Sequence, residues 1–220
     1  MNSDIILILV IGTALAFDFT NGFHDTANVV ATSISTGAAR PSVAIGFAAI
    51  LNFVGAFISI SVAATVAKDV VDAEIITPTI VFAGLIGAIA WNLITWYFGL
   101  PSSSSHALIG GLVGSAFAAA GPDAILGGGV VGKVLIPAVV APIVAFIVGG
   151  LGILMSYRVV GRLKPGQVGR GYRLGQIVSG GLLALAHGTN DAQKTMGVIT
   201  LALVANGSIS ADADVPTWVV

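Results

Sequence analysis

The chain has 220 residues, of which 56% are hydrophobic and 9% are charged, and its formal net charge is -1 at pH 7. Ordinary soluble domains carry about 25% charged residues, so this composition indicates a polytopic membrane protein rather than a soluble domain. The near-neutral charge gives no sign of nucleic-acid binding. Because the chain has no cysteine, disulfides, thiolate metal sites and cysteine nucleophiles are excluded.

Long apolar stretches predict an all-α fold of membrane helices. In chain order these stretches cover 4–20, 42–67, 75–100, 107–120, 130–157, 174–186 and 195–205. A helix needs roughly 20 residues to cross the hydrocarbon core, so some stretches span it and others are too short. The short ones flank polar sequence at 18–36, 101–106 and 187–194. We therefore predict broken helices whose interruptions line a site buried in the protein.

The basic residues predict how the helices are oriented. Five of the nine lysines and arginines lie in 158–173, and Arg40 follows the first stretch, so the positive-inside rule places both in the cytoplasm. The stretch 75–120 must then begin and end outside. Its second arm, 107–120, is about 21 Å long as a helix, which is short of the roughly 30 Å core. We favour a re-entrant hairpin with its tip at 101–106 over two full crossings.

Two short segments, 22–28 and 188–194, share the pattern G-x-[HN]-D-x-x-[NK]. Each lies in a polar break, and the predicted orientation makes the first enter from outside and the second from the cytoplasm. Matching segments that enter the membrane from opposite sides are typical of the inverted-topology repeats of secondary transporters. The binding sites of these transporters lie near the bilayer midplane. We therefore divide the chain into a first repeat (1–157), a basic cytoplasmic loop (158–173) and the start of a second repeat (174–220).

The second repeat has no counterpart of the serine-rich hairpin within these residues. Either the chain is a fragment of a longer protein, or two chains complete each other as a homodimer, and we favour the fragment. On that interpretation the 220 residues are expected to be inactive by themselves.

Two aspartates at matched positions of the repeat are the first candidate site residues. An aspartate inside a membrane segment costs about 2.5–3.5 kcal/mol on insertion scales, so Asp25 and Asp191 need partners. We predict that they bind the coupling cation or carry protons, with hard oxygens supplied by Asn21, Asn28 and Asn190. The alternative is that each aspartate only pairs with a buried lysine or histidine.

The serine-rich tip is a candidate anion site. Ser102, Ser103, Ser104 and Ser105, with His106, open the second helix of the hairpin. A helix N-terminus presents free N–H groups with a partial positive charge of about +0.5, and the hydroxyls add further donors for a tetrahedral oxyanion. An ordinary serine-rich loop with a helix cap is the alternative.

Further ionisable residues fall in the polar breaks. His24, His106 and His187 either exchange protons near neutral pH or remain neutral and bond to the backbone. Lys194 replaces Asn28 in the second copy of the repeat, and its ammonium group can take the place of a coupling cation or balance an anionic substrate. Asp18 is left out of the predicted site as a helix cap or an interfacial residue.

Three motifs resemble the signature elements of the inorganic phosphate transporter (PiT) family: NGFHDTAN at 21–28, LPSSSSHA at 100–107 and AHGTNDAQKTMG at 186–197. The resemblance covers essentially the whole chain. It implies a multi-pass symporter of the plasma membrane that moves inorganic phosphate with Na⁺ or H⁺. The residues that it implies as substrate or ion contacts are Asp25, Asn28, Ser102 to Ser105, Asn190 and Asp191.

Two departures are similar to the low-affinity bacterial branch: His24 and Lys194 stand where many members have asparagine. This branch implies proton coupling and phosphate carried as a complex with a divalent metal. We predict no resident metal or cofactor. The predicted ion-coupling residues are Asn21, His24, Asp25 and Asp191, and the predicted substrate contacts are Asn28, Ser102, Ser103, Ser104, Ser105, His106, Asn190 and Lys194.

Other functions remain open from the sequence. A Na⁺-coupled phosphate symporter and a sulfate permease on the same scaffold both fit the motifs, since sulfate is also a tetrahedral oxyanion. A passive anion channel fits less well, because it does not need a pair of carboxylates. The sequence contains no Walker loop, H-E-x-x-H or G-x-S-x-G motif, so an enzyme is not expected.

Overall fold

A computed structural model describes residues 3–58, 63, 66, 68–73, 75–163 and 165–220. Across these residues the structure is helical, with no strand beyond an isolated bridge between Val71 and Ile125. The longer helices are α1 (Ser3–Ser35), α2 (Pro41–Ala56), α4 (Pro78–Tyr97), α5 (Ser104–Ala120), α7 (Ile136–Val160) and α8 (Pro165–Ala205). Three single turns join α5 to α7, namely η1 (Pro122–Ala124), α6 (Gly127–Val130) and the π-helical η2 (Val131–Leu135). The predicted all-α fold is confirmed.

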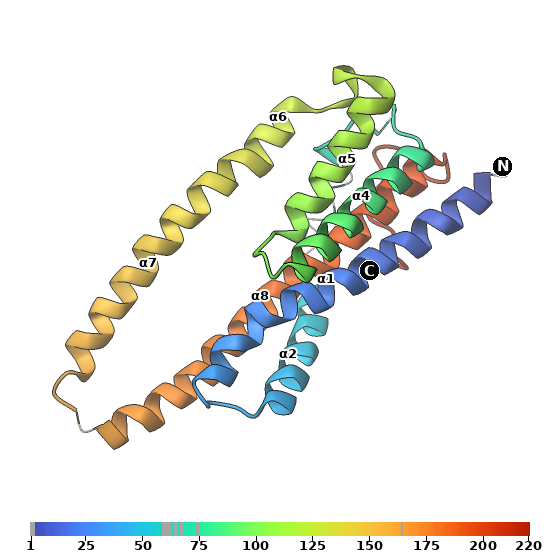
Figure 1. Ribbon diagram of the computed structural model, residues 1–220. Coiled ribbons are helices and arrows are strands. Elements are labelled where there is room, and N and C mark those ends of the chain that lie inside the picture. The colour runs from blue at the N-terminus through green and yellow to red at the C-terminus, as the bar shows by residue number, and fades with distance from the viewer. Residues whose placement is uncertain (1–2, 59–62, 64–65, 67, 74, 164) are drawn as a thin grey trace.

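Three of the described helical segments are long and apolar enough to cross a membrane: Ile5–Ser35, Pro78–Tyr97 and Gly127–Val160. The last segment includes α7, which has no buried residue and stands apart from the other helices in Figure 1. A helix that is apolar on every side suits lipid or a protein neighbour and not water. The protein is an integral membrane protein, as the composition predicts.

α1 and α8 lie side by side and run in opposite directions, and the other helices pack along this pair (Figure 1). The α4–α5 hairpin covers one half, where Phe17, Leu108 and Leu201 belong to the largest apolar cluster. α2 covers the other half, where Val29 and Ala184 belong to a second apolar cluster. The polar motifs of α1 and α8 lie between the two clusters. The antiparallel pair agrees with the opposite entry that the repeat predicts.

The α4–α5 hairpin is held together by a close approach at glycine. A Cβ atom on Gly111 of α5 would overlap the backbone carbonyl of Gly84 on α4. The tip of this hairpin reaches the middle of the α1–α8 pair, where Ser104 is 1% exposed. Ser104 is thus inserted between the helices, whereas Pro101, Ser103 and His106 of the same tip are exposed, and the re-entrant hairpin stays a prediction.

The structure corrects the prediction of broken helices in the two motif regions. α1 continues through 18–35, and α8 continues through 187–194. The polar side chains bond to one another across the α1–α8 interface, so the backbone groups keep their helical hydrogen bonds and no unwinding is needed. Of the three predicted breaks, the one at 101–106 contains a true gap between helices, before α5 begins at Ser104.

The basic segment 158–173 is also more helical than predicted, because α8 already begins at Pro165. The α7–α8 connection lies at the same end of the molecule as the α1–α2 connection, which contains Arg40 (Figure 1). Both segments that the sequence assigns to the cytoplasm thus share one end, and the N-terminus lies at the other.

The glycine contact in the hairpin predicts a difference between two neighbouring positions. Gly111→Ala should destabilise the protein by about 1–3 kcal/mol, because the two backbones must separate. Gly110→Ala is the matched control: no atom lies within 4 Å of its Cβ position, and alanine favours a helix by about 1 kcal/mol over glycine. Thermal unfolding of the purified variants in detergent measures the difference. Equal melting temperatures would contradict the hairpin packing.

Candidate substrate and ion site

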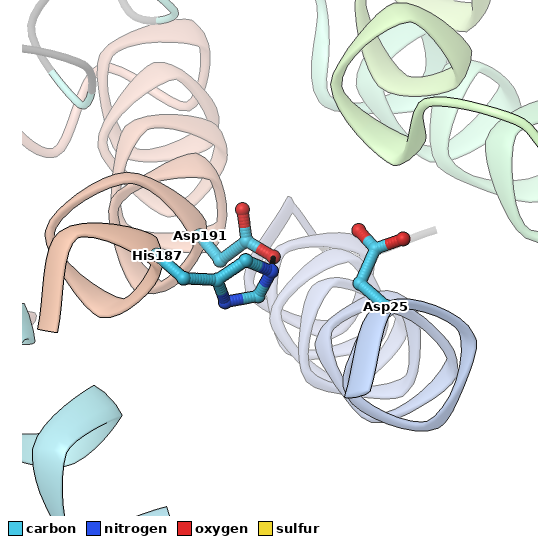
Figure 2. Close-up of side chains that lie close together, drawn as sticks. All are labelled: Asp25, His187 and Asp191. Atoms are coloured by element: carbon cyan, nitrogen blue, oxygen red, sulfur yellow. Dashed lines mark ion pairs between the residues drawn. The ribbon is translucent and has the colours of Figure 1, made fainter. Parts of the chain in front are cut away.

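The two motif aspartates meet at the centre of the molecule. Figure 2 shows Asp191 and His187 reaching from α8 toward α1, where Asp25 lies. One ligand atom from each of these three residues lies within 4.8 Å of those from the other two. Asn21 joins the helices directly, since its Nδ2 donates to Asp191 Oδ2 at 3.1 Å. The sequence prediction that the two carboxylates come together thus holds even though the helices are continuous.

Lys194 links the two carboxylates through a serine. Its Nζ is 2.7 Å from Asp191 Oδ1 and donates to Ser104 Oγ at 2.9 Å. Ser104 Oγ in turn donates to Asp25 Oδ2 at 2.8 Å. Because Lys194 is 2% exposed, this charged chain from α8 through α5 to α1 is shielded from solvent. An ammonium group that belongs to the protein therefore contacts Asp191 directly and is linked to Asp25 through Ser104.

Asp25 has further partners on its other oxygen. His24 Nδ1 lies 2.9 Å from Asp25 Oδ1, and Asn28 Nδ2 donates to the same oxygen at 3.4 Å. The second ring nitrogen of His24, Nε2, lies 3.3 Å from Thr95 Oγ1 on α4. The predicted residues of the first motif thus gather around one carboxylate, and α4 adds a threonine that the sequence analysis did not identify.

His187 connects the second carboxylate to α2. Its Nε2 lies 3.0 Å from Asp191 Oδ2, and its Nδ1 lies 2.9 Å from Asn52 Oδ1. Asn52 comes this close because Gly188 packs directly on the backbone of Asn52, where a Cβ atom would overlap it. Sequence analysis missed Asn52. The available signal was a lone amide side chain in the apolar stretch 42–67.

The group of Asp25, His187 and Asp191 has the composition of a metal site, but its atoms are already engaged. Both oxygens of each aspartate contact a protein donor within the described chain, and His187 bridges Asp191 and Asn52. A metal ion would have to displace these contacts. The arrangement fits proton exchange better than metal binding.

The four tip serines have different surroundings. Ser102 Oγ accepts from Trp91 Nε1 at 2.8 Å, and Ser103 Oγ caps α5 by accepting from the His106 backbone N–H at 3.3 Å. Ser104 is the buried serine that contacts Asp25 and Lys194. Ser105 is half-buried and borders the cavity described next. The helix cap that the sequence offered as an alternative is therefore present, alongside the contacts of Ser104.

A cavity of about 580 Å³ lies between α5, the segment η2–α7 and α8. We call it the basic cavity. Its polar lining consists of Ser103, Ser105, His106, Lys133, Asn190 and Lys194. No carboxylate is among the described residues that line it. Lys133 was not predicted; it lies on the π-helical turn η2, and such turns are frequent at functional sites.

A second cavity of about 320 Å³ lies between α1, α2 and α8. We call it the acidic cavity, and its polar lining consists of Asp18, Asn21, Thr26, Asn52, His187 and Asp191. Asp18, which the sequence analysis left out, accepts a hydrogen bond from Thr195 Oγ1 at 3.0 Å. The spacing of Asp18, Asn21 and Asp25 along one helix face was the signal that could have placed Asp18 here.

Paired charges thus lie between two apolar clusters of a bundle that contains membrane-length helices, an arrangement typical of membrane transport proteins. The sequence model of the phosphate transporter family matches residues 21–167 and 159–220. The chain belongs to the phosphate transporter family, which is a family of transporters and not of enzymes. The resemblance seen in the three sequence motifs is confirmed.

Relatives named "probable low-affinity inorganic phosphate transporter" come from Mycobacterium bovis (56% identity) and Bacillus subtilis (46% identity). Each match covers 98% of this chain, and 52% and 65% of the respective relative. The low-affinity inorganic phosphate transporter PitB of Escherichia coli is 34% identical over 91% of this chain and 46% of its own length. The chain thus spans about half the length of most of these relatives.

A solved structure described as "the sodium-dependent phosphate transporter" has the same fold. It superimposes with a TM-score of 0.72 at 19% sequence identity, covering 97% of this chain and 72% of that one. At this identity the likeness shows the arrangement of the helices.

The buried pair of Asp191 and Lys194 predicts strongly coupled mutations. Lys194→Met should destabilise the protein by roughly 3–5 kcal/mol, because it removes the buried ammonium that pairs with the Asp191 carboxylate. The double variant Asp191→Asn/Lys194→Met should recover most of this loss. Melting temperatures of the single and double variants test the coupling. The exposed pair of Lys68 and Asp214, at 4.0 Å, is the control and should show no measurable coupling. Additive effects at Asp191 and Lys194 would contradict the buried pair.

Proposed function

We propose that this chain forms part of a transporter that moves inorganic phosphate across the plasma membrane together with protons, and that phosphate binds in the basic cavity. The composition of that cavity carries the proposal: two lysines and two serine hydroxyls line it, with no carboxylate among the described lining residues. The names of the relatives, low-affinity inorganic phosphate transporters, support the same substrate. Because the chain resembles the low-affinity bacterial branch of the family, the proposal includes phosphate that is carried as its complex with a divalent metal.

The N-terminus of α5 complements the lysines. Ser103 and Ser105 border the basic cavity at the first turn of α5, where backbone N–H groups are available for an anion. Lys194 at the inner wall is tied to Asp191, so phosphate must share it with that carboxylate. Sharing weakens the hold on phosphate, which suits a site that has to release its substrate.

The continuous helices favour protons over Na⁺ as the coupling ion. In transporters with broken helices, unwound carbonyls coordinate Na⁺. Here α1 and α8 keep their backbone hydrogen bonds through both motifs. Lys194 also pairs with Asp191 and reaches Asp25 through Ser104, so it already supplies the positive charge that a coupling cation would bring.

The surroundings of His187 suit a bound proton. Asn52 Nδ2 donates to the carbonyl of Ala48 at 2.8 Å, which turns Asn52 Oδ1 toward the ring. Asp191 lies at the other ring nitrogen. Both neighbouring oxygens can accept a hydrogen bond, so the ring can donate from either nitrogen.

His24 has an equivalent arrangement in the first motif. Thr95 Oγ1 donates to the carbonyl of Trp91 at 2.9 Å, so it accepts from His24 Nε2. Asp25 accepts from the other nitrogen. Each motif thus offers one histidine that can hold or release a proton beside an aspartate, and we propose these two pairs as the proton-coupling sites.

Uptake by proteoliposomes tests the coupling ion and the substrate. An inward proton gradient should drive accumulation of labelled phosphate, and unlabelled phosphate, but not sulfate, should compete. A requirement for a Na⁺ gradient with no response to ΔpH would contradict proton coupling. Currents without accumulation would indicate a passive channel, and competition by sulfate would indicate a sulfate permease.

Lys133 offers a test of the basic cavity. Lys133→Met should raise KM for phosphate by about tenfold with a smaller change in the maximal rate, because a hydrogen bond to a charged group contributes about 1.5–3 kcal/mol. Lys133→Arg should keep most of the affinity. Lys68→Met, which removes a lysine that bonds to the C-terminal segment, is the control. An unchanged KM in Lys133→Met would remove Lys133 from the substrate path.

A further inference from the structure

We propose that the acidic cavity binds one hydrated divalent cation, with Asp18 Oδ2 and Asn21 Oδ1 as its protein ligands. This cavity lies between α1, α2 and α8 and is distinct from the basic cavity. The side chains of the acidic cavity can hold this cation whatever substrate the basic cavity binds.

Asn21 supplies the first observation. Its side chain is 2% exposed and borders the cavity, and its Nδ2 is used by Asp191. Its Oδ1 is buried and has no hydrogen-bond partner among the described residues. A buried acceptor without a partner costs about 1–3 kcal/mol. A cation, or a water bound to one, in the adjoining cavity would satisfy this oxygen.

Asp18 supplies the negative charge. Thr195 donates to its Oδ1, while Oδ2 has no hydrogen bond within the part of the chain that the structure describes. Asp18 lies three residues before Asn21 on the same face of α1, so the two side chains are neighbours. Asp191 also borders the cavity, but its oxygens are taken by Lys194, His187 and Asn21. Asp18 is therefore the carboxylate with coordination capacity left.

The size of the cavity and its few ligands favour a divalent ion that keeps its water. A water molecule takes about 30 Å³ of liquid volume, so a cavity of about 320 Å³ has room for a cation with much of its hydration shell. Mg²⁺ gives up water reluctantly and typically binds proteins through one or two carboxylates. Two oxygens from α1 suffice for such an ion, whereas a dehydrated Na⁺ needs a closer cage. Thr26 and Asn52 provide polar groups for the bound waters.

The charges around the acidic cavity are compatible with a bound cation. The described residues that line the acidic cavity include no lysine or arginine. The nearest positive groups are His187, which borders the cavity, and Lys194, which lines the basic cavity instead. Both are paired with Asp191. The cavity therefore presents the charge of Asp18 to an entering cation.

Mn²⁺ binding tests the proposal directly, because Mn²⁺ substitutes for Mg²⁺ and the free aqueous ion gives an EPR signal. Purified protein in phosphate-free nanodiscs should bind one Mn²⁺ per chain, and Mg²⁺ but not Na⁺ at equal ionic strength should displace it. Asp18→Asn should weaken Mn²⁺ binding at least tenfold. Asp18→Glu, which keeps the carboxylate, should retain binding. The control Asp123→Asn removes an exposed carboxylate from η1 and should leave binding unchanged.

Two results would overturn the site: no saturable Mn²⁺ binding by the wild-type protein, or equal Mn²⁺ affinity in the wild type and Asp18→Asn. Mn²⁺ binding by the wild-type protein tests the site even if Asp18→Asn fails to fold. Phosphate binding without divalent ions, measured on the same samples, separates this proposal from the proposed function. Mn²⁺ binding that depends on Asp18 supports the cation site whether or not phosphate binds.

Discussion

The ion pair between Asp191 and Lys194, 2.7 Å long and buried in a membrane protein, is the contact on which the rest of the structure depends. Neither charge is tolerated alone at this depth, since a single buried charge costs several kcal/mol. The pair draws in Ser104 at the hairpin tip, and through it Asp25 on α1. The positions of α1, α5 and α8 relative to one another are therefore fixed by the need to neutralise these charges.

The same network explains why α1 and α8 do not unwind. A polar side chain in hydrocarbon can be satisfied by freed backbone groups or by other side chains. Here Asn21 bonds to Asp191 and Thr195 bonds to Asp18, so most of these polar groups find side-chain partners across the helix interface. Small residues make this possible, because Gly188 lets α2 approach closely enough for Asn52 to reach His187. Because the backbone carbonyls of continuous helices are used in helical hydrogen bonds, an ion at the centre of the protein must be bound by side chains.

The fold class and the centre of the site could be predicted from sequence because both depend on local patterns. Apolar stretches indicate the helices, and the repeated motif identifies Asp25 and Asp191 as partners. The contributions of Asn52, Thr95 and Lys133 could not be predicted, because each lies on an element whose position is set by packing. The continuity of α1 and α8 was missed for the same reason: a polar stretch in an apolar helix looks like a break until its partner is known.

The two cavities lie on opposite sides of the charge network and have opposite character. Lys194 lines the basic cavity, Asp191 lines the acidic cavity, and the two are bonded to each other. On the proposed function, an anion that engages Lys194 withdraws part of its charge from Asp191. The carboxylate then interacts more strongly with His187, whose Nε2 lies 3.0 Å from its other oxygen. On this proposal, the anion on one side and His187 on the other are linked through one ion pair, which would give symport a physical basis without any break in the helices.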